Sequence, residues 1–93
     1  MTTIIQGIEN SINYMTDLAL HVIEWNNTIE AVQDRTEHYV ERLEQIGIML
    51  HILGLSDQIS NRSKVRLESM VHKAISTVQV ASYDKLNKLS KTE

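Results

Sequence analysis

The chain contains no cysteine, no proline and no phenylalanine, and only three of its 93 residues are glycine. Without cysteine it can form neither a disulfide framework nor a thiolate metal site. β-Sandwiches and barrels need a turn about every 8 to 12 residues, and such turns are rich in proline and glycine. The scarcity of both residues therefore predicts an all-α protein, and the length predicts a single helical domain over residues 1–93.

Long apolar runs are also scarce. Residues 1–10 lack the basic residues and the unbroken apolar core of a signal peptide. The most apolar stretch, residues 46–55, contains a histidine, and it is half the length of about 20 residues that a membrane crossing needs. We therefore expect a cytoplasmic protein with no membrane partner.

Apolar residues recur at alternating steps of four and three through the first half of the chain, which is the spacing of a coiled-coil-like helix. This seam consists of Ile4, Ile8, Ser11, Met15, Leu18, Val22, Trp25, Ile29, Val32, Thr36, Tyr39, Leu43, Ile46, Leu50 and Leu53. It predicts a first helix over about residues 3–53. The alternative is a break at Asn26-Asn27, where Asn27 would cap a new helix and Glu30 would be its capping-box partner. The apolar spacing continues across this point without a slip, so we favour a continuous helix.

The segment Leu53-Gly54-Leu55-Ser56-Asp57 predicts a turn, with Gly54 in the left-handed cap position and Ser56 capping the next helix. The second helix is expected over about residues 57–89. Its narrower seam consists of Leu67, Val71, Ala74, Val78, Ala81, Leu86 and Leu89. A short connection between two long helices predicts an antiparallel hairpin. In that hairpin Thr36 faces Ala74, and Arg66 lies near Glu44.

Two groups of apolar residues have no partner in such a hairpin, and we expect them to bind another protein or a second copy. The first lies on the part of the first helix that extends past the end of the second, and consists of Ile4, Ile5, Ile8, Ile12, Met15 and Leu18. The second lies at the hairpin tip, residues 46–55, which is apolar around its circumference, and includes Ile48, Met49, His51, Ile52 and Leu55. The expected assembly is a dimer of hairpins that forms four helices. A three-helix bundle that covers the first group internally is the alternative.

No glycine-rich phosphate loop, nucleophile elbow or zinc signature occurs, so the sequence predicts a non-enzymatic protein with no cofactor and no metal. The expected function is association, with itself or as a subunit, adaptor or chaperone of a larger assembly. A small regulator that occludes a protein or nucleic acid is the alternative. Duplex binding is not favoured, because the basic cluster Arg62, Lys64 and Arg66 belongs to a chain of net charge -3. Burial of His51 at an interface would weaken association below about pH 6, and a nearby acid such as Glu44 would reverse that sign.

Overall fold

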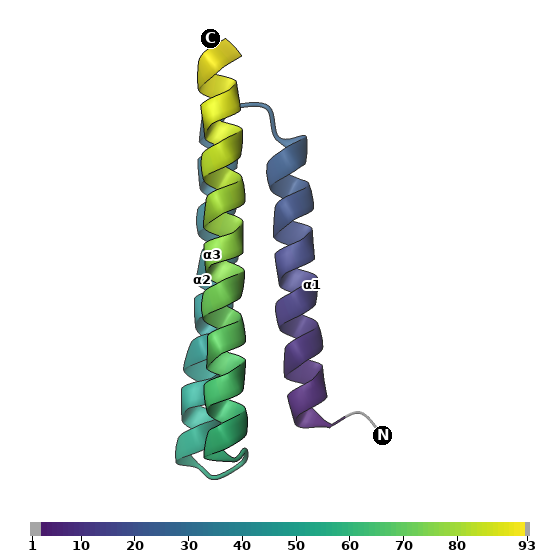
Figure 1. Cartoon of the computed structure of the whole chain (residues 1–93), viewed down its shortest axis with the longest axis vertical. Coiled ribbons are helices and arrows are strands. Elements are labelled where there is room, and N and C mark those ends of the chain that lie inside the picture. The colour runs from purple at the N-terminus through teal and green to yellow at the C-terminus, as the bar shows by residue number, and fades with distance from the viewer. Residues whose placement is uncertain (1–2, 93) are drawn as a thin grey trace.

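The computed structural model describes residues 3–92 and consists of three helices, α1 (Ile4–Trp25), α2 (Ile29–Leu55) and α3 (Asn61–Thr92). The chain runs up α1, down α2 and up α3, so that α1 and α3 are parallel and α2 is antiparallel to both (Figure 1). Each helix contacts the other two, which makes the molecule a slender bundle of 52 × 24 × 16 Å. The prediction of an all-α protein is confirmed, since residues 3–92 contain no strand.

The first helix is not continuous, and the prediction of one helix over residues 3–53 is wrong. Asn26 ends α1, and both its backbone N–H and its side-chain amide donate to the Val22 carbonyl, at 3.2 and 2.6 Å. Thr28, one residue later than the cap expected at Asn27, begins α2 by accepting a hydrogen bond from Ala31 N–H at 3.1 Å. These bonds satisfy backbone groups that a helix break would otherwise leave unpaired. The break lets α1 fold back onto α2 and α3, so the three-helix alternative describes this chain.

The core is formed by one face of each helix. Its buried apolar residues are Ile8, Ile12, Ala19 and Ile23 in α1, Val32, Tyr39, Leu43 and Leu50 in α2, Ile59 in the second turn, and Leu67, Val71, Ala74 and Val78 in α3. The buried apolar residues of α2 and α3 follow the predicted seams, but beyond Val78 the buried residue of α3 is Ser82 and not the predicted Ala81.

In α1 the buried face is rotated from the predicted seam by about one residue. Ile12 and Ile23 are buried where the seam had Ser11 and Val22, and Trp25, a predicted seam residue, is 80% exposed. The rotation arises because α1 packs against α2 and α3 together, and it therefore turns the face centred on Ile12 and Ile23 into the bundle.

The second turn lies slightly later than predicted. Gly54 remains inside α2, and the left-handed residue is Asp57, with φ 57°. The Asp57 and Gln58 N–H groups donate to the carbonyls of Gly54 and Leu53 at 3.3 and 2.9 Å, the hydrogen-bond pattern of a Schellman motif. Ser60, and not Ser56, caps α3, because its hydroxyl accepts from Ser63 N–H at 3.1 Å.

The later turn changes which residues of α2 and α3 face each other. Thr36, predicted to face Ala74, makes a hydrogen bond of 2.8 Å to the buried Ser82, about two helical turns further along α3. Arg66 accordingly pairs with Glu9 of α1 and not with Glu44.

The structure contains no helix within residues 3–92 that combines the length and the apolar character needed to cross a lipid bilayer.

Candidate protein-interaction surface

The exposed face of α2 changes character near residue 46. Up to that point every exposed residue of the helix is polar or charged, namely Glu30, Gln33, Asp34, Arg35, Glu37, His38, Glu41, Arg42, Glu44 and Gln45. Beyond it the exposed residues are Ile48, Met49, His51, Ile52 and Leu55. We call Ile48, Met49, Ile52 and Leu55 the apolar patch. Three of them, Ile48, Ile52 and Leu55, are spaced by four and three residues and therefore share one side of the helix.

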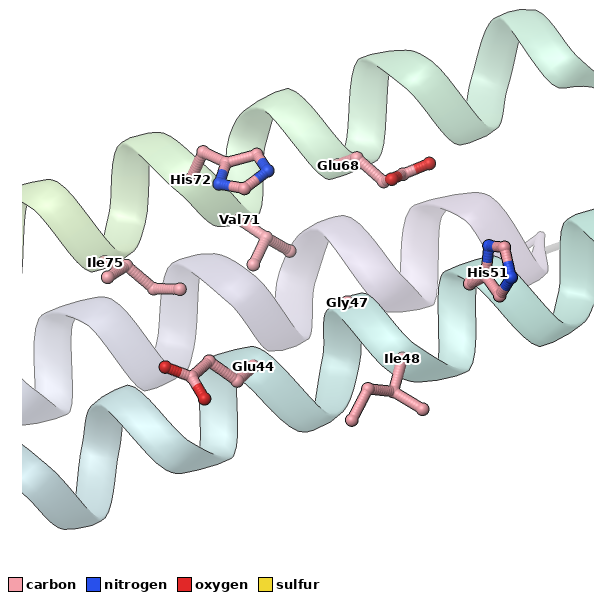
Figure 2. Close-up of a pocket in the computed structure, with 8 residues that line it drawn as sticks. All are labelled: Glu44, Gly47, Ile48, His51, Glu68, Val71, His72 and Ile75. Atoms are coloured by element: carbon pink, nitrogen blue, oxygen red, sulfur yellow. The ribbon is translucent and has the colours of Figure 1, made fainter.

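A groove between α2 and α3 adjoins this patch. It has a volume of about 390 Å³, is open to solvent, and is lined by Glu44, Gly47, Ile48 and His51 of α2 and by Glu68, Val71, His72 and Ile75 of α3. In Figure 2 α1 lies behind the two helices, so the groove opens on the side of the α2–α3 pair that α1 does not cover.

Gly47 keeps the groove open. A Cβ atom placed on Gly47 would lie 3.8 Å from Val71 Cγ1, an ordinary van der Waals contact, so a side chain here would fill the groove without disturbing the helices. Glycine in a helix interior costs about 1 kcal/mol relative to alanine. The residue therefore reduces helix stability and leaves a hollow at the surface.

The charged and titratable groups lie around the apolar floor of the groove. Glu44 and His51 lie at opposite ends of the α2 side, with Gly47 and Ile48 between them (Figure 2). On the α3 side, Glu68 forms an ion pair of 3.0 Å with Lys64, and His72 is exposed. On the α2 side the centre of the groove is thus apolar, and its two ends are polar.

The two groups of residues that the sequence predicted to bind a partner differ in how far the structure exposes them to solvent. In the first group, Ile8 and Ile12 are buried in the core, and Ile5, Met15 and Leu18 are partly buried against it, whereas Ile4 is exposed. The premise that this group lacks a partner on its own chain is wrong, because the break at Asn26 lets α2 and α3 cover it. The second group, at the hairpin tip, remains at the surface: Ile48, Met49, His51, Ile52 and Leu55 are all exposed.

Sequence reasoning missed the α3 side of the groove. Val71 was identified only as a core residue and Ile75 not at all, because the periodicity of one helix does not show which residues flank a groove between two. The signal that would have drawn attention to this place is Gly47, a glycine inside a strongly periodic helical segment.

The basic cluster at the start of α3 is partly occupied by acidic partners. Lys64 pairs with Glu68 within α3, and Arg66 pairs with Glu9 across the α1–α3 contact. Both pairs are partly exposed, and such pairs contribute about 0 to 1 kcal/mol each.

Comparisons with protein-family models, with curated proteins and with solved structures find no match to this chain. Within residues 3–92 no group of three or more histidine, cysteine, aspartate or glutamate side chains is placed to hold a metal ion.

Proposed function

We propose that this protein is a non-enzymatic interaction module that binds an apolar helical surface of a protein through the apolar patch and the adjoining groove. The observation that carries this proposal is the abrupt change along the exposed face of α2, from charged residues up to Gln45 to apolar residues from Ile48 onward.

The energetics favour a bound state for the patch. Scattered exposed apolar residues are normal on protein surfaces, but a contiguous group is characteristic of an interaction site. Ile48 is 62% exposed and Ile52 is 57% exposed, and fully burying an exposed side chain of this size stabilises a complex by about 1.5 to 3 kcal/mol. Covering two or three such residues offers enough free energy to offset part of the entropy lost on association.

The shape of the surface fits a helix. Two packed helices leave a groove along their contact, and the side chains of a third helix fit into it with their axes about 8 to 10 Å apart. The apolar centre favours apolar side chains on the partner. The engagement of Lys64 and Arg66 by glutamates favours a protein partner over a nucleic acid.

Photo-crosslinking in cells that express the protein tests this proposal directly. A photoreactive amino acid replaces Ile52 in one variant and Val80 in another. Val80 is the matched control, because it is 60% exposed on α3 and is not part of the patch or the groove. We expect a protein adduct of defined mass from position 52 and none from position 80, and we expect Leu55→Glu to remove the adduct from position 52. Equal labelling at the two positions, or an adduct that survives Leu55→Glu, would show that the patch is not the binding surface.

A further inference from the structure

We infer that the occupant of the groove is a second copy of this chain, packed antiparallel along α2 about a two-fold axis that passes beside Gly47 and Ile48. This inference rests on the proposed function, since it names the partner of the same surface. The argument depends on the groove being complementary to itself in both shape and charge.

The steric complementarity comes from two adjacent residues. When two identical helices pack antiparallel about an axis between positions 47 and 48, Gly47 of each copy faces Ile48 of the other. Gly47 has no side chain, so the groove is hollow above Val71. The next residue, Ile48, projects into solvent. Ile48 of the second copy therefore fills the space above Gly47, and the exchange is reciprocal, as a two-fold interface requires.

The same register also brings opposite charges together. Glu44 lies three residues before Gly47, and His51 lies three residues after Ile48, so Glu44 of each copy faces His51 of the other. Within one chain the two residues are seven positions apart, about 10 Å along the helix, and lie at opposite ends of the α2 side of the groove. The interface thus contains two Glu44–His51 contacts, one on each side of the axis.

These residues share one stripe of α2. Glu44, Ile48, His51 and Leu55 are spaced by four, three and four residues, which is the spacing of a helix–helix contact. All four are exposed in the single chain, so that none of them has to leave the core to reach a partner. The α2 and α3 helices of two copies would then form the four-helix layer at the centre of the dimer.

The charge contacts give the dimer a pH dependence of definite sign. Histidine is the side chain whose charge ordinarily changes between about pH 5 and pH 8. The other titratable groups that line the groove are Glu44 at the far end of its α2 side and Glu68 and His72 on α3, with Glu68 already paired to Lys64. Since Glu44 of the second copy favours the imidazolium form, association strengthens as the pH falls through this range.

Sedimentation of the full chain over a range of concentrations provides the first test. The wild type is expected to form a dimer, and Gly47→Leu is expected to weaken it by about tenfold or more, because leucine occupies the space that Ile48 of the second copy needs. Gly7→Leu is the matched control, since Gly7 lies inside α1 with no neighbouring atom within 4 Å of an added Cβ. If the leucine variant does not fold, Gly47→Ala replaces it, because its Cβ fills less of the same hollow and makes only an ordinary contact with Val71. We expect it to fold and to weaken the dimer less.

A charge exchange at about pH 6 provides the second test. His51→Glu places two carboxylates opposite each other and is expected to weaken the dimer by about tenfold, whereas His51→Glu combined with Glu44→Lys restores an attractive pair. The His51→Gln variant is expected to lose the difference in dimer affinity between about pH 6 and about pH 7.5, and His72→Gln is expected to keep it.

The outcomes separate this inference from the proposed function. A wild type that stays monomeric at all concentrations, with a crosslink from position 52 to a different protein, would overturn the second copy as occupant and leave the proposed function standing. A dimer that is unaffected by Gly47→Leu and Gly47→Ala would overturn the groove as its interface. Failure of the double charge variant to recover affinity would overturn the antiparallel register.

Discussion

Asp57 is, among the residues that the structure describes, the one non-glycine residue with a positive φ, and it follows the last turn of α2. A left-handed backbone is strained for residues that carry a Cβ, although aspartate tolerates it better than most. Its negative charge also lies at the carboxyl end of a helix, where the helix dipole disfavours it. Both effects make this residue a point where the fold is less stable than it could be.

We therefore expect Asp57→Gly to raise the free energy of unfolding by about 1 kcal/mol, because glycine removes the strain and the charge together. Asp57→Ala removes the charge but keeps a Cβ at a positive φ, which alanine tolerates less well than aspartate, so its free energy of unfolding should stay below that of the glycine variant. Urea denaturation followed by circular dichroism measures both changes. A glycine variant no more stable than the alanine variant would show that the backbone conformation at this position costs little.

Ile23 and Trp25 provide a second comparison at the scale of single residues. Ile23 is 2% exposed in the core, and Trp25 is 80% exposed beside the first turn. Ile23→Ala should lower the free energy of unfolding by about 2 to 5 kcal/mol, and Trp25→Ala should change it by about 0.5 kcal/mol or less. Denaturation followed by circular dichroism, which does not depend on the tryptophan, measures both. A larger loss from the tryptophan variant would mean that α1 buries the face predicted by its sequence seam.

At the scale of the elements, the break between α1 and α2 decides the architecture. Asn26 and Thr28 supply the hydrogen bonds that close one helix and open the next. The break then places α1 parallel to α3, where Glu9 pairs with Arg66 and the Lys85 ammonium donates to the Glu24 carbonyl at 2.8 Å.

Spin labels at Asn10 and Glu41, both exposed, test this arrangement. In the bundle the two positions lie about 10 Å apart along the axis and about 10 Å apart across it, so that the distance between them should be below about 25 Å. A continuous helix would separate them by about 46 Å. Labels at Gln33 and Gln45, both on α2, serve as the control at about 18 Å in either case. Labelled protein diluted with unlabelled protein restricts the measurement to distances within one chain.

At the scale of the whole molecule, α1 completes a core that α2 and α3 cannot close by themselves. It contributes Ile8, Ile12, Ala19 and Ile23 to the buried cluster, and it contacts both other helices. Two-helix hairpins bury too little apolar surface to be stable alone. Because α1 leaves the groove uncovered, it stabilises the pair and leaves the candidate interaction surface accessible.

Removal of α1 is therefore expected to abolish cooperative folding. A chain of residues 28–93 should lose most of its helical circular dichroism and melt without a sharp transition, whereas the full chain melts cooperatively. A peptide of residues 1–27 added to the truncated chain should restore part of the helical signal. A truncated chain that melts as sharply as the full chain would show that α2 and α3 form a stable unit, for example by pairing with a second copy.

The sequence alone determined the helical class, the second turn to within a few residues, the buried faces of α2 and α3, and the exposed apolar residues of the hairpin tip. These features depend on the spacing and composition of residues within one segment, and they do not depend on which segments pack against each other. The tertiary structure decided the break at Asn26, the rotation of the buried face of α1, the register of α2 against α3, and the groove over Gly47. Each of these depends on which helices lie side by side. The seam of α1 is compatible with two faces, and only the packing of α1 against α2 and α3 together selects the face of Ile12 and Ile23.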